Sequence, residues 1–340
     1  MPKYAIITGG AGFIGSHLVD RLLDEGDWQV VVIDNFHPGY PRAIKESNLA
    51  RHRDDPRLRL VEGDILDDAT LDTAFYGVDP RKAVVVHLAA LVGVRPSMAM
   101  AREYHRVNVT GTLHLLEQAR ARQAAHFVLA SSSSVYGKEP AVPWREDMER
   151  LEPVSPYAAT KLAAEEFTRV YARLHGLDAT VLRFFTVFGP RQRPDLAIHA
   201  FFRKIGRAEP IQQFGAGLTS RDYTYVADIV DGVRRAMDRP MVRKPGQGSF
   251  EIFNLGHSEP IVLKDLIAAI ERECGQQAVV EVLPDQPGDV PHTYADVEKA
   301  RKQLGYEPST SLGAGLRAFA DWFREHEEIF QPVERGTPTG

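Results

Sequence analysis

Short apolar runs alternate along the chain with longer stretches whose apolar positions recur at helical spacing. The strand-like runs cover residues 4–7, 30–33, 58–61, 84–88, 126–130, 180–183 and 251–254. Some of them, such as Val-Val-Val-Ile at 30–33, are apolar throughout, which is typical of strands covered on both faces. Helical patterns occupy residues 16–25, 70–76, 101–122 and 156–175. This alternation predicts an α/β protein with a doubly wound parallel sheet.

The strand–helix rhythm loosens after about residue 186. Loop-rich segments at 189–194 and 284–289 interrupt it, and a run near 246–256 reads as a return to the sheet. We therefore expect a sheet domain over residues 1–185, with a returning segment at about 226–256. Residues 186–225 and 257–330 are expected to form a smaller C-terminal lobe, and 334–340 a disordered tail.

Composition narrows the class of protein. The chain has 340 residues, 44% hydrophobic and 26% charged, with a formal net charge of −5. This charge offers no basic field for nucleic acid or an anionic membrane. Cys274 is the single cysteine, so the chain has neither an intramolecular disulfide nor a cysteine zinc site. No apolar stretch approaches the roughly 18 residues of a membrane span, and no signal-peptide pattern precedes the first strand. We expect a cytoplasmic enzyme without a metal.

A glycine fingerprint follows the first predicted strand and opens the first helix. Gly9 permits a tight turn, Gly12 lets the backbone approach a pyrophosphate, and Gly15 lets the helix pack on the strand. A lone glycine triplet is a weak signal, since any strand-to-helix turn can carry one. Asp34 strengthens it, because an acid at the end of the second strand is placed to bond the adenosine ribose and to repel a 2′-phosphate. The pattern predicts a Rossmann-type site for NAD.

Two further strand ends supply candidate cofactor contacts. Asp64 and Ile65 follow the third strand, at a sheet edge where adenine could lie. Ala89 and Ala90 follow the fourth strand, where small side chains let the backbone reach the middle of a dinucleotide. The alternatives are a plain turn acid for Asp64 and tight packing for the two alanines.

The candidate catalytic residues lie in the middle of the chain. Tyr157 and Lys161 are separated by four residues on a predicted helix, so they share a face. An ammonium beside a phenol favours phenolate, which would make Tyr157 a general base near neutral pH. Ser132 follows the fifth predicted strand, at the sheet edge where ligands bind. A helix-surface pair and a polar serine loop are the alternative readings.

The motifs together resemble the extended short-chain dehydrogenase/reductase family of nucleotide-sugar epimerases and dehydratases. They are residues 8–15 (TGGAGFIG), 87–90 (HLAA), 131–137 (SSSSVYG), 157–161 (YAATK) and 221–226 (RDYTYV). The resemblance covers the chain to about residue 328. It implies an NAD-binding Rossmann domain and a C-terminal lobe that binds UDP or another nucleotide. It also implies cofactor contacts from Phe13, Ile14, Asn35, Leu88, Asn108, Phe184, Tyr157 and Lys161.

Finer features are similar to those of UDP-glucuronate 4-epimerases, at residues 93–97, 183–195 and 286–290. This likeness implies substrate contacts from Arg95, Ser133, Ser134, Thr186, Arg191, Arg193, Arg221 and Asp289. Either Arg191 or Arg193 could bind a C5 carboxylate through a charge-assisted pair, and the resemblance favours Arg193. The alternatives are that both arginines bind the diphosphate or order their loop, that Arg221 forms a structural salt bridge with Asp222 or another acid instead of meeting phosphate, and that Asp289 is a turn residue.

The resemblance implies epimerisation at C4 of a UDP-sugar, most simply UDP-glucuronate to UDP-galacturonate. The 4-hydroxyl would be oxidised by NAD, the 4-keto sugar would rotate, and reduction would follow on its other face. Related decarboxylases and dehydratases carry an acid where this chain has Ser134, which argues against those lyase reactions. A UDP-glucose or UDP-N-acetylhexosamine 4-epimerase stays open, as does a lyase with an unusual acid. A non-catalytic NAD-sensing regulator would lack Tyr157 and Lys161.

Two helical segments, 101–122 and 156–175, predict self-association. Ala159, Leu162, Ala163 and Phe167 place small and apolar side chains along one of them. By resemblance to the family, the two segments would form an intersubunit four-helix bundle in a homodimer. The alternative is that these faces only pack on the sheet.

Overall fold

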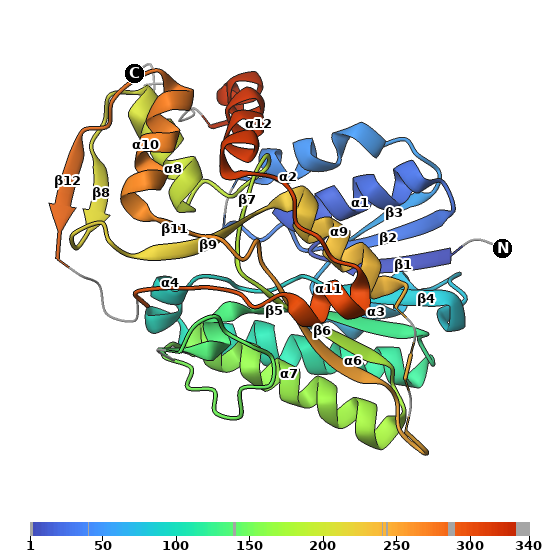
Figure 1. The fold of residues 1–340 in the computed structure, drawn as a ribbon. Helices are drawn as coiled ribbons and strands as arrows, with labels where there is room; N and C mark the ends of the chain where they lie inside the picture. Colours follow the sequence, from blue (N-terminus) through green and yellow to red (C-terminus); the bar gives the residue numbers. More distant parts are fainter. Residues whose placement is uncertain are drawn as a thin grey trace.

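A single parallel sheet organises the chain (Figure 1). The computed structural model describes residues 3–39, 41–138, 141–239, 241–242, 244–284 and 290–330. The predicted tail at 334–340 lies outside this range. The sheet has seven strands in the order β3-β2-β1-β4-β5-β6-β10. They are β1 (Lys3–Thr8), β2 (Trp28–Asp34), β3 (Leu58–Glu62), β4 (Ala83–His87), β5 (His126–Ser132), β6 (Ala179–Phe184) and β10 (Phe250–Leu255). Every neighbouring pair is parallel, and each predicted strand overlaps one of the seven.

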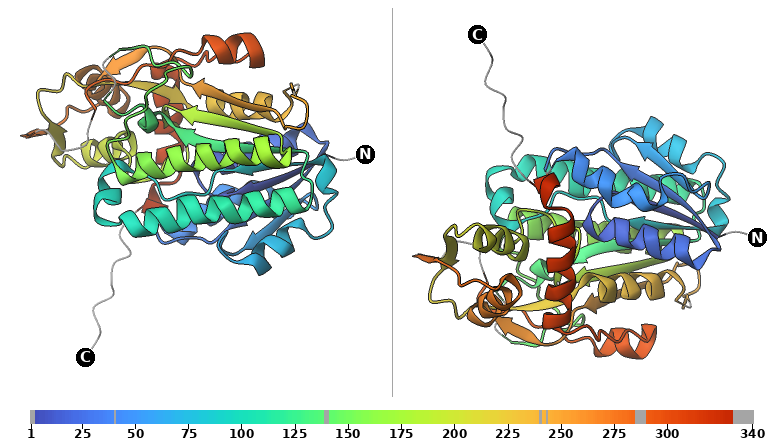
Figure 2. Two further views of the ribbon diagram at one scale, coloured as in Figure 1. Left: turned by 90° about the horizontal axis from the view of Figure 1, so that it is seen from below. Right: turned by 90° about the horizontal axis from the view of Figure 1, so that it is seen from above.

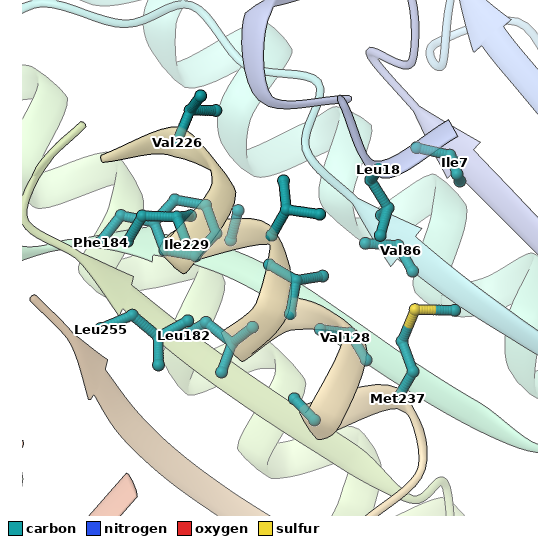
Figure 3. Packing of buried hydrophobic residues seen from close by; sticks show 14 of the residues in the cluster. Ile7, Leu18, Val86, Val128, Leu182, Phe184, Val226, Ile229, Met237 and Leu255 are labelled. Atoms are coloured by element: carbon teal, nitrogen blue, oxygen red, sulfur yellow. The ribbon is translucent and has the colours of Figure 1, made fainter. Parts of the chain in front are cut away.

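Helices cover both faces of this sheet (Figure 2). One face packs against α1 (Phe13–Glu25), α2 (Arg42–Leu49), α9 (Val226–Met237) and α11 (Glu298–Leu304). The other packs against α3 (Asp68–Phe75), α6 (Gly111–Ala121) and α7 (Pro156–His175). Figure 3 shows Ile229 and Met237 of α9 on strands that carry Val86, Val128 and Leu182.

The apolar runs of the strands follow from this double cover. In β2, Val30 and Val32 belong to one buried cluster, whereas Val31 and Ile33 belong to the cluster on the opposite face. Successive strand residues point to opposite faces, so a strand covered on both sides needs apolar side chains at every position. The continuous pattern in the sequence is the direct result.

The predicted helix at 101–122 is present in the structure as one helical run with a wider turn in its middle. It consists of α5 (Ala101–His105), a π-helical turn (Arg106–Thr110) and α6, and it is preceded by α4 (Val94–Ala99). The turn carries Asn108, whose side chain is buried and bonds to the backbone of Leu91 in both directions, at 2.8 and 2.9 Å. A wider turn of this kind places a side chain that regular helical spacing would aim elsewhere. Periodicity alone does not detect it.

A smaller group of elements lies at the side of the sheet away from the N-terminus (Figure 1). A three-stranded sheet joins β7 (Thr186–Phe188), β9 (Ser220–Tyr225) and β11 (Pro260–Val262), and β8 (Ile211–Phe214) pairs with β12 (Val280–Leu283). Around them stand α8 (Ala197–Gly206), α10 (Leu263–Cys274) and α12 (Leu312–Glu325). Short 3₁₀ turns cover Ala50–His52, Pro80–Lys82, Ser133–Tyr136 and Glu327–Phe330. Since β1 starts at the N-terminus and all strands are parallel, this group faces their carboxyl ends. The exact domain boundaries stay a prediction.

Candidate active site

The glycine turn between β1 and α1 has no room for side chains. Gly9 has φ 71°, and a Cβ there would lie 2.9 Å from the backbone nitrogen of Ala89. A Cβ on Gly15 would lie 2.3 Å from the carbonyl oxygen of Gly9. Gly12 is the N-cap of α1 and supplies no capping side chain. The first backbone N–H groups of α1 therefore have no capping side chain. Such groups fit the pyrophosphate of a dinucleotide.

Asp34 is held firmly at the carboxyl end of β2. Its carboxylate accepts the backbone N–H groups of Ala11 at 3.2 Å and Phe36 at 2.9 Å, and it pairs with Lys45 at 2.8 Å. Both side chains of the ion pair are almost fully buried. The sequence did not indicate Lys45 as a partner. The contacts fix Asp34 beside the glycine turn, and its bond to a ribose stays a prediction.

The other predicted adenine-side residues contact one another. Asn35 donates its side-chain amide to Asp64 at 3.1 Å, and Asp64 also accepts the backbone N–H of Leu66 at 3.0 Å. Ile65 is buried, in close contact with Gly111 of α6. These residues form one polar edge next to β2 and β3, as expected for two neighbouring strand ends.

Beneath the loop after β4, a chain of hydrogen bonds fixes the tautomer of His87. The hydroxyl of Thr112 donates to the carbonyl of Asn108, so it accepts from Nε2–H of His87 at 2.9 Å. Nδ1 of His87 then accepts from the Thr8 hydroxyl at 2.7 Å, and Thr8 accepts the N–H of Ala89 at 3.1 Å. Burial and, secondarily, the charge of Lys161 lower the pKa of His87 to about 3. The imidazole is therefore neutral.

The same chain continues to the catalytic helix through Asn108. Its side-chain amide donates to the hydroxyl of Thr160 at 3.1 Å, and that hydroxyl donates to the carbonyl of Tyr157 at 2.8 Å. The structure thus uses Asn108 to join the loop after β4 to α7. The cofactor contact predicted for Asn108 is not visible in these bonds and stays a prediction, as do those of Leu88 and Ala90.

Ser132, Tyr157 and Lys161 converge at the carboxyl end of β5. Ser155 caps α7 by accepting the N–H of Ala158 at 3.1 Å, and the helix starts at Pro156, one residue before the tyrosine. Burial raises the pKa of Tyr157, while a hydrogen bond with Ser132 and the charge of Arg193 lower it. Ser132 and Tyr157 are therefore in contact, while the catalytic roles of Ser132, Tyr157 and Lys161 stay predictions.

Lys161 is anchored to the neighbouring strand. Its ammonium donates to the carbonyl of Ala130 at 2.9 Å. Burial lowers its pKa to about 8, opposed by the carboxylate of Glu165. The charge of Arg193 lowers the pKa of the Tyr157 phenol, a contribution that the helix spacing did not indicate. The role of Lys161 in favouring the phenolate stays a prediction.

Sequence reasoning missed a buried ion pair below these residues. Arg183 of β6 donates two bonds to Glu165 of α7, at 3.0 and 2.8 Å, and the side chains are 2% and 0% exposed. Glu165 also accepts the hydroxyl of Ser131, next to Ser132. Arg183 stacks on the ring of Tyr136 at 4.8 Å. Glu165 is one turn beyond Lys161, so the same helical spacing could have drawn attention to it.

The two arginines after β7 have different partners. Arg191 pairs with Asp20 of α1 at 2.8 Å. Arg193 makes a bidentate pair with Asp195, at 2.9 and 2.5 Å, and its charge also lowers the pKa of Tyr157. Arg193 is therefore the arginine whose charge acts on Tyr157, whereas Arg191 is held against the first helix.

The remaining predicted substrate residues lie on several different elements. Ser133 and Ser134 form the 3₁₀ turn after β5, and the buried hydroxyl of Ser134 has no hydrogen-bond partner among the described residues. Thr186 starts β7, and Phe184 ends β6 opposite Ser132. The guanidinium of Arg95 lies 4.3 Å from the centre of the Phe214 ring.

Arg221 and Asp222 bond to different groups, and the phosphate contact predicted for Arg221 stays a prediction. Arg221 of β9 donates to the carbonyls of Ser220 at 2.9 Å and Pro291 at 3.3 Å. Asp222 instead accepts three backbone N–H groups, at 2.8 to 3.0 Å. Asp289 lies outside the described residues.

Other classes of site find no support in the described part of the chain. No group of three or more histidine, cysteine or acidic side chains there could hold a metal ion. None of the described helices has the length and apolar character needed to cross a membrane. A surface hollow of about 560 Å³ beside Glu146 and Lys299 has mixed charge and contains none of the predicted site residues.

Comparisons with known proteins agree with this arrangement. The family model described as GDP-mannose 4,6 dehydratase matches residues 6–319. The UDP-glucuronate 4-epimerase of Thermodesulfobacterium geofontis (strain OPF15) is 38% identical over 335 residues, which cover 97% of this chain and 99% of that protein.

Two solved structures have the same fold. The UDP-glucuronic acid 4-epimerase from Bacillus cereus, in complex with UDP-glucuronic acid and NAD, has a TM-score of 0.87 and 35% identity, covering 95% of this chain and 99% of that one. The UDP-glucose 4-epimerase from Thermotoga maritima with UDP-glucose has a TM-score of 0.85 and 32% identity over 95% of this chain and 99% of that one. The predicted fold class is confirmed.

Proposed function

Because this chain belongs to the GDP-mannose 4,6 dehydratase family, which it matches over residues 6–319, we propose that it is an NAD-dependent isomerase that converts UDP-glucuronate to UDP-galacturonate. One observation carries the choice of substrate. The guanidinium of Arg193 is close enough to Tyr157 to lower the pKa of its phenol. An acidic sugar that presents its 4-hydroxyl to Tyr157 would meet a cation near its C5 carboxylate.

The residues present fit a bound dinucleotide. Gly9, Gly12 and Gly15 leave the N-terminus of α1 open for the pyrophosphate. Asp34 would bond the adenosine ribose, and Lys161 the nicotinamide ribose. NAD, when bound, supplies the hydride acceptor for C4 and a positive ring that favours the phenolate.

Tyr157 acts as the general base and then as the general acid. Its phenolate takes the proton of the 4-hydroxyl while the hydride leaves C4, and it returns that proton to the keto oxygen when the hydride comes back. Ser132, which bonds the phenol of Tyr157, would also bond the same sugar oxygen and keep it in line with the phenol. Lys161, anchored to Ala130, holds the ribose side of the site.

The carboxylate would be bound by Arg193 with help from nearby hydroxyls. Ser133, Ser134 and Thr186 follow β5 and β6 at the same edge of the sheet. The buried Ser134 hydroxyl lacks a partner among the described residues, and a buried polar group without one is costly, so it is well suited to a ligand oxygen. Position 134 is a serine and not an acidic residue. Elimination and decarboxylation are therefore left without an acidic proton donor at this position.

A neutral sugar is the second candidate substrate, and one observation favours it. Asp195 already neutralises Arg193 through a bidentate pair. A UDP-glucose or UDP-N-acetylhexosamine 4-epimerase would use the same tyrosine and serine without a free cation at C5.

The test is incubation of the purified protein with UDP-glucuronate and no added NAD, followed by chromatography and mass analysis. We expect a second peak of unchanged mass that co-elutes with UDP-galacturonate, absent in Tyr157→Phe. Loss of carbon dioxide would identify a decarboxylase instead. Turnover of UDP-glucose or UDP-N-acetylglucosamine alone would keep the chemistry and refute the acidic substrate.

We also propose a homodimer and a cytoplasmic location. Phe167, Val170 and Leu174 of α7 are 37%, 42% and 72% exposed and recur along one face together with Ala159 and Ala163. This apolar stripe supports pairing of α6 and α7 with a second copy. The balanced charge and the single cysteine are consistent with a reducing compartment.

A further inference from the structure

The loop from Gly189 to Asp195 has an unfavourable backbone conformation next to the sugar site. Gly189 has φ 140° and Arg191 has φ 64°. The value for Arg191 lies in the left-handed region, which residues other than glycine, asparagine and aspartate rarely adopt. Such a conformation persists only where surrounding contacts over-determine it, and outliers of this kind cluster at functional sites.

The cofactor helix α1 holds one side of this loop. Arg191 donates to Asp20 at 2.8 Å, with both side chains largely buried. One turn earlier, Nε2 of His17 bonds the carbonyl of Pro190 at 3.0 Å. Burial and the charge of Arg191 lower the pKa of His17 to about 4, so at neutral pH this imidazole is uncharged and donates a hydrogen bond from Nε2–H to the carbonyl of Pro190. Both anchors lie on one face of α1.

The small lobe holds the other side. Nδ1 of the buried His199, on α8, bonds the carbonyl of Gln192 at 2.7 Å, and the Gln192 side chain donates to the carbonyl of Val187 at 3.2 Å. Aromatic rings of α12 and the turn that follows it, including Phe319 and Phe330, pack edge-on against His199. Residues 190–192 are thus fixed from two directions, and Arg193 is the next residue.

We propose that Asp20 is a positioning residue for substrate recognition: through Arg191 it fixes the loop that aims Arg193 at the sugar carboxylate. This inference rests on the proposed function. The helix that would bind the pyrophosphate and the arginine that would bind the sugar then form one rigid unit. Asp20 itself touches neither ligand. Its loss should therefore weaken recognition of the carboxylate and leave the binding of the nucleotide unchanged.

The experiment compares Asp20→Asn with Asp24→Asn, one turn further along α1. Asp24 is half exposed and pairs with Arg51 at 2.9 Å, so it matches the charge change without touching the loop. Isothermal titration of the purified NAD-containing protein gives the affinity for UDP-glucuronate and for UDP. We expect Asp20→Asn to weaken UDP-glucuronate binding about tenfold, the value of one charge-assisted hydrogen bond. Affinity for UDP should change less than about twofold, and Asp24→Asn should behave as the parent.

A second variant separates positioning from folding. Asparagine tolerates the left-handed conformation, so Arg191→Asn keeps the backbone and removes the ion pair. It should reproduce the selective loss, and the double variant should lose no more than either single variant. Equal weakening of UDP and UDP-glucuronate, or no change in either, would overturn the inference. If the parent protein does not convert UDP-glucuronate to UDP-galacturonate, the proposed acidic substrate is wrong, and that result is visible before any variant is made.

Discussion

Replacing Glu165 with glutamine should both destabilise the protein and change its pH profile. The substitution keeps the size of the side chain and removes its charge. Arg183 then has no carboxylate for the two bonds that it donates at 3.0 and 2.8 Å. With the side chains 2% and 0% exposed, water cannot take the place of the lost partner.

The size of the effect follows from that burial. Breaking a buried pair by removing one partner costs about 3–5 kcal/mol, because the remaining charge stays desolvated. Burial by itself lowers the pKa of Arg183, and the hydrogen bonds that it donates to Glu165 raise it above its ordinary value. A guanidinium is not deprotonated in proteins, so Arg183 stays charged in the variant. A double change, Glu165→Gln with Arg183→Met, removes the stranded charge and should recover most of the lost stability.

The neighbouring residue provides a matched control. Glu166 is 56% exposed and pairs with Arg169 at 3.3 Å, so Glu166→Gln should cost roughly 0–1 kcal/mol. Urea unfolding is followed by far-ultraviolet circular dichroism for the three variants and the parent. Their unfolding midpoints are compared with one common slope of unfolding free energy against urea concentration. Equal midpoints for Glu165→Gln and Glu166→Gln would refute the reasoning.

The pH dependence of kcat tests the change of charge separately, because a loss of stability alone would not shift it. Glu165 raises the pKa of Lys161, which burial lowers to about 8. Without that carboxylate, and with Arg183 still positive, the pKa of Lys161 should fall further. If the charged form of Lys161 is needed, the alkaline limb of kcat shifts to lower pH in Glu165→Gln and stays in place in Glu166→Gln. His87, facing Lys161 from β4, is neutral throughout this range because its pKa is about 3.

Three further outcomes are expected. Activity of the parent should decline above about pH 8, as Lys161 loses its proton, and a profile flat to pH 10 would contradict that role. Gly15→Ala should abolish the retention of NAD, because the added Cβ would lie 2.3 Å from the carbonyl oxygen of Gly9. Retained NAD is measured by absorbance after denaturation. Gly313→Ala is the control, because the added atom there meets open space. Leu174→Asp should give monomers in light scattering, because a charge would enter the apolar stripe of α7; an unchanged dimer would place the interface elsewhere.

The sequence by itself determined the sheet, the glycine turn and the grouping of Tyr157 and Lys161 on one helix. Each depends on local patterns: continuous apolar runs for strands covered on both faces, glycines where no Cβ fits, and a helical spacing that brings Tyr157 and Lys161 to one side. The family motifs then gave the chemistry, because they combine these local features in a fixed order along the chain.

Only the tertiary structure decided which charges meet. Lys45 pairs with Asp34, Glu165 with Arg183, and Arg191 with Asp20. The partners of the last pair are 171 positions apart in sequence. An ion pair depends on which elements become neighbours and on how deeply they are buried, and neither is written in the local spacing of residues. For the same reason, Arg191 and Arg193 are equivalent by position in the sequence, yet in the fold one clamps the loop to α1 and the other acts on the catalytic tyrosine.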